Sequence, residues 1–163
     1  MRLALLSLLA LLPTSCGGET PLTFDSPQAA MEAGDAALAA RDTKAAIAAF
    51  SSAAEGFAID SEAGWKARAR LCEAHLLAGD SRGAESLLGT ILAPDSSANS
   101  IGLRRLGDAM VLAGEASLAD KLMTAAVARF PEDKEAFSRI ADGLEALKSG
   151  DAQALAALGY AGD

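Results

Sequence analysis

Aromatic side chains are scarce in this chain, which has one Trp, one Tyr and five Phe among 163 residues. No run of β-branched residues occurs either, and aromatic and β-branched residues are the types that strands favour. These two shortages exclude a β-sandwich as the expected fold. Alanine and leucine instead dominate a hydrophobic fraction of 51%. Because both residues have high helix propensity, the composition predicts an all-α protein.

Basic residues are also few. The 14 Lys and Arg residues are outnumbered by 22 Asp and Glu residues, which gives a net charge of −8. A protein that binds the nucleic-acid backbone needs a basic surface, and an acidic surface is repelled by anionic lipid headgroups. We therefore expect no nucleic-acid partner and no membrane contact through the folded surface.

The residue types that most often perform catalysis are rare as well. His75 is the only histidine, and Cys72 and Cys16 are the only cysteines. Cys72 and His75 are three residues apart on one predicted helix and share a face, and a Cys–His pair can activate a thiolate. Two ligands do not complete a metal coordination shell, and buried packing is the better interpretation of both residues. We expect no catalytic residues, no metal site and no cofactor.

The first residues have the pattern of an export signal. Met1 and Arg2 precede an apolar run, Leu3–Leu12, which is too short to span a bilayer. The next residues, Pro-Thr-Ser-Cys-Gly-Gly, resemble a bacterial lipobox, with Pro13 where that motif prefers leucine. The resemblance implies that Cys16 is acylated and becomes the first mature residue. The predicted location is the cell envelope, with the protein anchored to the outer membrane and facing the periplasm.

This pattern divides the chain into three predicted parts. They are a signal peptide at 1–15, a flexible tether at 16–26 and a folded domain at 27–163. Ordinary signal cleavage without a lipid and a buried N-terminal helix are the alternatives. If Cys16 is lipidated, Cys72 has no intramolecular disulfide partner.

From Ser26 onward the sequence predicts helices in pairs. Ser26 followed by Pro27 is a favourable helix start, and Gly, Asp or Pro marks most later boundaries. The eight predicted helices cover residues 27–40, 43–57, 61–79, 80–94, 98–114, 117–130, 131–148 and a short segment from 152.

Small and large apolar residues recur at related positions in successive helix pairs. The recurring positions are Gly34, Ala46, Phe50 and Ala53; Cys72, Ala84 and Leu88; Gly107, Ala119, Met123 and Pro131; and Phe137, Ile140, Ala141 and Leu144. This pattern, with a repeat near 34 residues, resembles the tetratricopeptide family over residues 27–148. The resemblance implies an α-α superhelix (solenoid) of about three and a half helical hairpins. An unrelated stack of helical hairpins is the alternative.

In tetratricopeptide proteins the first helices of the hairpins line a concave groove that binds extended or helical peptides. An acid follows each small position here, and an arginine precedes each of the last three acids by three residues. The expected groove residues are therefore Asp35, Arg70, Glu73, Arg105, Asp108, Arg139 and Asp142. We predict i,i+3 ion pairs in the last three hairpins and a basic or polar partner segment for the acids. The alternative is ordinary solvated helix surface with weak local ion pairs.

Apolar residues on the same helices offer a second kind of contact. Leu76, Leu77, Val111 and Leu112 are either anchors for a partner or packing residues of the hairpins. Trp65 is interpreted as a packing residue at a hairpin junction rather than as an exposed anchor.

The tail Leu-Ala-Ala-Leu-Gly-Tyr, which ends at Tyr160, is similar to the ending of some sulfatase-type enzymes, and we expect it to cap the last hairpin. The leading hypothesis is a non-catalytic protein–protein interaction scaffold, an envelope lipoprotein that binds a protein or peptide in its groove. The alternatives are an accessory subunit that docks an envelope enzyme of sulfatase type and an enzyme in its own right.

Overall fold

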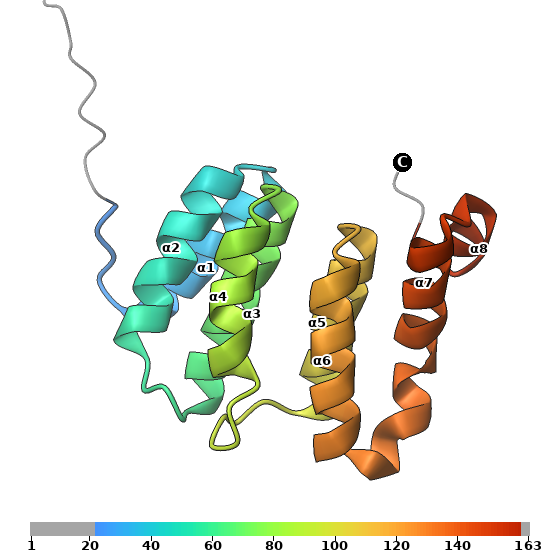
Figure 1. Cartoon of the computed structure of the whole chain (residues 1–163). Helices are drawn as coiled ribbons and strands as arrows, with labels where there is room; N and C mark the ends of the chain where they lie inside the picture. The colour runs from blue at the N-terminus through green and yellow to red at the C-terminus, as the bar shows by residue number, and fades with distance from the viewer. Residues whose placement is uncertain (1–21, 161–163) are drawn as a thin grey trace, which may run out of the picture.

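The computed structural model describes residues 22–160, and every regular element in that range is helical (Figure 1). The elements are α1 (Pro27–Ala39), α2 (Thr43–Gly56), α3 (Glu62–Leu77), α4 (Ser81–Ile91), α5 (Ser100–Leu112), α6 (Ala116–Arg129), the 3-10 helix η1 (Pro131–Phe137), α7 (Ser138–Ser149) and α8 (Ala152–Ala157). The predicted all-α class is confirmed. Between residues 22 and 160, no helix is long and apolar enough to cross a membrane. The predicted signal peptide and Cys16 lie outside the described residues.

Consecutive helices pair into hairpins that follow one another in chain order (Figure 1). The pairs are α1 with α2, α3 with α4, α5 with α6, and α7 with the short α8. Neighbouring hairpins also pack on each other, because α2 contacts α3, α3 contacts α5, and α5 contacts α7. The first helices of the last three hairpins therefore lie next to one another, and an ion pair between Arg70 and Asp35 links α3 to α1.

The same turn joins the two helices of every hairpin. One residue of each turn has a positive φ, and these residues are Arg41 (60°), Gly79 (72°), Gly114 (77°) and Gly150 (72°). The next residue donates its N–H to the helix carbonyl five positions earlier, as in a Schellman turn. In three of the turns that residue is an aspartate whose side chain also caps the following helix. Because the turn recurs, the two helices of every described hairpin are connected with the same local geometry.

The predicted seventh helix, at 131–148, is wrong in its first half. Residues Pro131–Phe137 form η1, and α7 begins only at Ser138. Phe137 is the only buried residue of η1. The segment has no apolar stripe that would hold an α-helix against the core, so a tighter turn suffices to bring Phe137 inside.

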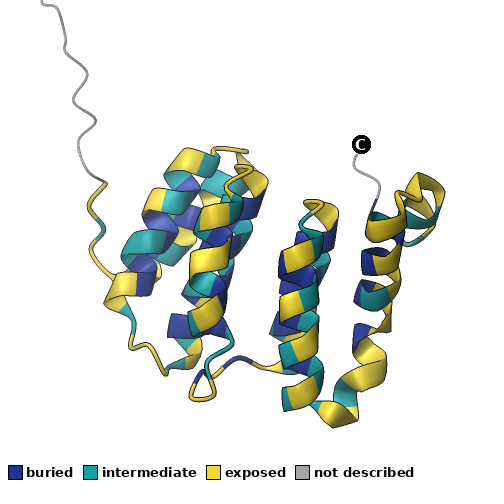
Figure 2. Ribbon diagram, viewed as in Figure 1, coloured by how far each residue is buried: buried dark blue, intermediate teal, exposed yellow. Residues whose placement is uncertain are grey.

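Two apolar clusters hold the helices together, and α3 contributes to both (Figure 2). The N-terminal cluster is mostly alanine, gathered around Phe50 and Leu71 between the first three helices. The larger cluster extends from Trp65 through α4, α5, α6 and α7 to Tyr160. Each hairpin thus buries apolar side chains between its own helices and also against a neighbouring hairpin, as stacked helical units must.

Small residues allow close contacts between helices at several of the predicted positions. A Cβ atom on Gly34 would collide with the ring of Phe50, and Cys72 Sγ lies 3.6 Å from the carbonyl oxygen of Ala84. Both contacts are between the two helices of one hairpin. Packing therefore explains why these positions hold small side chains.

The last two hairpins use their small residues differently. A Cβ atom on Gly107 would lie 2.7 Å from Ile140 of the next hairpin. In the fourth hairpin the predicted position, Ala141, is only half-buried. The close contact falls instead at Gly143, where a Cβ atom would lie 2.5 Å from the ring of Tyr160. The reason is that α8 has only six residues, so the tail rather than a full second helix covers α7.

Trp65 packs where two hairpins meet, as predicted. It is 4% exposed, and its ring lies against Gly102 at the start of α5. A Cβ atom at Gly102 would collide with that ring, so glycine permits the contact.

Candidate functional site

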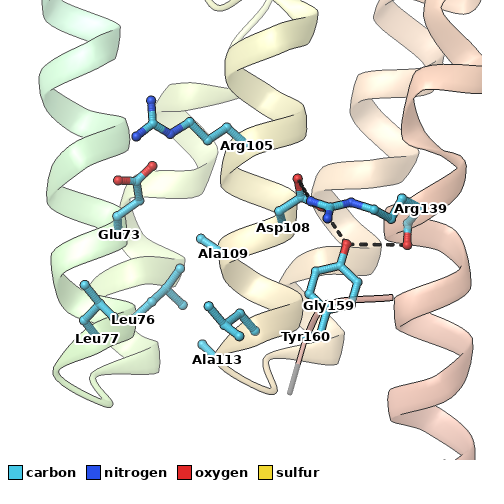
Figure 3. Close-up of a pocket in the computed structure, with 11 residues that line it drawn as sticks. Glu73, Leu76, Leu77, Arg105, Asp108, Ala109, Ala113, Arg139, Gly159 and Tyr160 are labelled. Atoms are coloured by element: carbon cyan, nitrogen blue, oxygen red, sulfur yellow. Dashed lines mark hydrogen bonds and ion pairs between the residues drawn. The ribbon is translucent and has the colours of Figure 1, made fainter. Parts of the chain in front are cut away.

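The first helices of the hairpins line a groove on one face of the molecule. It consists of three adjoining depressions with volumes of about 480, 560 and 470 Å³. The first and second share Met31, Asp35 and Lys66, and the second and third share Glu73 and Arg105. Residues of α1, α3 and α5 form most of this surface, and Tyr160 of the tail closes the third depression (Figure 3). We call it the groove.

Large aliphatic side chains are exposed in the groove. Leu77 is 63% exposed, Ile101 is 69% exposed and Leu112 is 53% exposed. Leu77 and Leu112 line the third depression, and Ile101 lines the second. Among residues 22–160, only five large hydrophobic side chains are exposed, so three of them are concentrated here. The other two anchors considered from the sequence, Leu76 and Val111, are buried and serve as packing residues.

Charged side chains cross the groove where hairpins meet. The first junction lies between the first and second hairpins, the middle junction between the second and third, and the last junction between the third and fourth. At the first junction, Arg70 Nε donates to Asp35 Oδ1 at 2.9 Å, and Arg70 Nη1 donates to Glu73 Oε2 at 2.5 Å. The Arg70 and Glu73 side chains are 26% and 13% exposed. The predicted Arg70–Glu73 pair therefore forms, together with an unpredicted pair across the junction.

The last junction has a matching arrangement. Arg139 Nη2 lies 2.5 Å from Asp108 Oδ2, and the hydroxyl of Tyr160 donates to Asp108 Oδ1 at 2.6 Å (Figure 3). The guanidinium of Arg139 also lies over the Tyr160 ring, 5.1 Å from its centre. Burial of Tyr160, and the hydrogen bond that it donates to Asp108, raise the pKa of the phenol above its ordinary value of 10.0.

Two predicted ion pairs do not form. Arg105 is not bonded to Asp108, and Arg139 is not bonded to Asp142, because Asp108 instead accepts from Arg139 of the next hairpin. An arginine side chain is long enough to reach a neighbouring helix as well as one turn of its own. Asp108 is only 22% exposed between the helices, and a pair there is screened less by solvent than one on the open surface.

The middle junction differs from the other two at Arg105. In the same register, Arg70 and Arg139 each bond an acid of the preceding hairpin, which makes Glu73 the acid expected for Arg105. Arg105 faces Glu73 across the groove (Figure 3), but the carboxylate of Glu73 is bonded to Arg70. Within the part of the chain that the structure describes, the exposed Arg105 has no hydrogen bond or ion pair.

Asp142 lies apart from the other six predicted groove residues. It is exposed and lines a separate depression between α6, η1 and α7, together with Phe137 and Val127. This acid therefore does not line the groove with Asp35, Glu73 and Asp108.

Cys72 and His75 occupy packing positions. Cys72 is fully buried, and burial is the main cause that raises the pKa of its thiol to about 12. His75 Nδ1 lies 2.8 Å from Asp80 Oδ2, and the ring covers Gly83 of α4. Within residues 22–160, no group of three or more His, Cys, Asp or Glu side chains is placed to hold a metal ion.

Searches against family models, curated proteins and solved structures find no match to this chain. The site must therefore be interpreted from its own geometry.

Ile101 and Tyr160 are among the groove residues that were not identified from the sequence. Ile101 stands in the first turn of α5, four residues before Arg105 and so on the same face. This four-residue spacing could have identified Ile101 as a groove residue. Tyr160 was expected only as part of a cap, and its hydrogen bond to Asp108 joins residues 52 positions apart, which no local pattern reveals.

Proposed function

We propose that this chain is a non-catalytic scaffold that binds a protein or peptide segment in the groove. The observation that carries the proposal is the concentration of exposed aliphatic side chains, Leu77, Ile101 and Leu112, in two adjoining depressions of the groove. Exposed apolar side chains gathered in a concave, partly charged surface are typical of binding sites, whereas single exposed ones are ordinary. The burial of Cys72 supports a role without catalysis.

The architecture that fits this function is a superhelix of tetratricopeptide-like hairpins. Three observations support it: the repeated turn, the close contacts at small residues, and the side-by-side placement of the first helices. In such an array the first helices present one continuous surface to a partner. Three hairpins and a shortened fourth correspond to the length of the described chain.

We also propose that the protein is exported and anchored in the cell envelope through a lipid on Cys16. The support is the N-terminal pattern, a basic residue and an apolar run followed by a cysteine among small residues. Metabolic labelling with a palmitate analogue should mark the wild-type protein and not Cys16→Ser, and the variant should leave the membrane fraction. If Cys16→Ser remains with membranes, the anchor proposal is wrong.

Site-specific photo-crosslinking tests the binding surface. A photoreactive amino acid is placed at Leu77, Ile101 or Leu112 in the groove, or at Ile59, which is 59% exposed but lies outside it. In the native cells, we expect the three groove positions to give a common crosslinked product that Ile59 does not give. If Ile59 gives the same product, or the groove positions give none, the groove is not the binding surface.

A further inference from the structure

The charge of the groove around Arg105 is opposite to that of the whole protein. The two depressions that share Arg105 are lined by four cationic residues, Lys66, Arg70, Arg105 and Arg139, and three anionic ones, Asp35, Glu73 and Asp108. Their net charge is +1, although the full chain carries −8. Three of the four acids predicted to meet a basic partner, Asp35, Glu73 and Asp108, are already bonded to Arg70 or Arg139. What remains for a partner is the unpaired guanidinium of Arg105.

Aliphatic side chains flank Arg105 on both sides along α5. Ile101 precedes it by four residues and Leu112 follows it by seven, with Leu77 of α3 lining the same depression as Leu112. At a rise of about 1.5 Å per residue, these side chains lie about 6 Å and about 10 Å from Arg105 along the helix axis. An extended peptide covers these distances with about two and about three residues, at about 3.3 Å per residue.

We propose that the partner segment is a peptide with an acidic side chain that pairs with Arg105 and aliphatic side chains on both sides of that acid. This inference rests on the proposed function of the groove and adds the chemistry of its ligand. The expected pattern is an aliphatic residue, one spacer, Asp or Glu, one or three spacers and a second aliphatic residue, in either chain direction, because alternate side chains of an extended peptide point to the same face. A carboxylate is the natural ligand because a guanidinium presents two parallel donors to it.

An acid within the peptide, rather than a carboxylate at its end, fits the positions of the exposed aliphatic residues. A chain that ended at Arg105 would leave either Ile101 or the pair of Leu77 and Leu112 without an apolar contact. A basic side chain at this point would instead meet the unpaired arginine and be repelled.

The test uses the purified full-length chain and a phage library of random twelve-residue segments. Each segment is joined to the coat protein at its C-terminal end, so that none has a free carboxylate there. We expect the wild type to select segments with Asp or Glu between two aliphatic residues at the stated spacing. Arg105→Glu should select Lys or Arg at that place. Arg104→Glu is the matched control, because Arg104 is an exposed neighbour on α5 that does not line the groove.

Binding of the best selected segment, made as a synthetic peptide with blocked ends, gives the quantitative outcome. Replacing its acid with Gln should raise Kd about tenfold or more for the wild type and leave Kd for Arg105→Ala unchanged. A competing peptide with a free C-terminal carboxylate and no acidic side chain should not displace it. Equal competition by that peptide would overturn the choice of an internal acid.

The result also separates this inference from the proposed function. If the selected segments lack an acid, and Leu112→Asp abolishes their binding while Arg105→Glu does not, the groove binds peptides but the acidic ligand is wrong. If no selected segment depends on Leu112 or Arg105, both proposals fail.

Discussion

The three junctions of the molecule place an arginine in the same register and use it in different ways. At the first junction Arg70 bonds one acid across the junction and one on its own helix. At the last junction Arg139 bonds Asp108 and covers the Tyr160 ring. At the middle junction Arg105 bonds nothing within the described chain, and the contact between hairpins beside the groove is apolar, through Trp65 and Gly102. Polar contacts join these two hairpins outside the groove, where Lys121 pairs with Glu85. In this register, an arginine bonds the acid of the preceding hairpin unless another arginine already bonds that acid.

This difference assigns separate roles to the junctions. A partly buried ion pair between two helices fixes how they approach, because removing either member leaves a charge with poor solvation. The first and last junctions are fixed in that way. The middle junction is held by the packing of Trp65 and, outside the groove, by the Lys121–Glu85 pair, while Arg105 has no bond among the described residues. The unpaired cation of the proposed groove therefore lies at the centre of the array.

Removing the apolar contact of the middle junction should have the largest effect. Trp65→Ala deletes the ring that packs against Gly102 in the larger cluster, and we expect it to lower the free energy of unfolding by about 3–5 kcal/mol. Urea unfolding followed by far-ultraviolet circular dichroism measures this. Trp65→Phe is the control, since it keeps a ring and removes an indole N–H that is buried without a partner among the described residues. A loss below about 1 kcal/mol for Trp65→Ala would mean that this contact does not hold the junction.

Breaking the first junction should cost less. Arg70→Ala leaves Glu73, whose side chain is 13% exposed, without its partner, and we expect a loss of about 1–3 kcal/mol in the same unfolding measurement. Arg139→Ala is the matched change at the last junction. Its side chain is 52% exposed, so the expected loss is about 0.2–1 kcal/mol. The reverse order of the two losses would contradict this comparison.

The last junction can be followed through the ionisation of Tyr160, the only tyrosine of the chain. Its pKa in the folded protein is raised above 10.0, so its ultraviolet phenolate absorbance should appear at a higher pH than in the urea-unfolded chain. Asp108→Asn should lower that pKa toward 10.0, because part of the shift comes from the hydrogen bond to this carboxylate.

The same shift makes stability depend on pH in the alkaline range. Tyr160 is protonated in both the folded and unfolded chain below pH 10.0, where its contribution to stability is complete. As the pH rises above 10.0, the unfolded phenol ionises first, so the free energy of unfolding should fall. Tyr160→Phe lacks this ionisation and is the control. An equal alkaline loss of stability in Tyr160→Phe would show that other groups cause it.

Removing the unpaired arginine should have the smallest effect on stability. Arg105 is exposed and bonded to no described residue, so Arg105→Ala should change the free energy of unfolding by less than about 0.5 kcal/mol. A loss equal to that of Arg70→Ala would show that Arg105 is paired in solution. The expected combination, unchanged stability with lost peptide binding, would distinguish the middle junction from the other two.

Local signals were enough to predict most of the fold. Ser26 and Pro27 mark the start of α1, and aspartates at the turns cap the helices that follow. These interactions join residues that are close in the sequence, so they can be predicted from short sequence patterns. The prediction for the first half of the seventh helix was wrong because Pro131 suggested a helix start, while the polar residues between Pro131 and Phe137 offered no face to bury.

The groove could be predicted only in part. The register of Arg70, Arg105 and Arg139 follows from the repeat, but each arginine had two acids within reach. The acid that each arginine bonds depends on the distance between neighbouring helices and on the exposure of the pair. The spacing of residues along one helix determines neither. The contact of Tyr160 with Asp108 could not be predicted either, because the two residues are 52 positions apart in the sequence.

The turn shared by all four hairpins has a consequence for the width of the face that carries the groove. Because each turn returns the chain with the same geometry, every hairpin adds one first helix to that face. Neighbouring helices in proteins pack about 8–10 Å apart, so each repetition of the turn widens the face by about that distance. The number of turns therefore sets the width of the face, whereas the length of α5 sets how far the proposed peptide can extend along it.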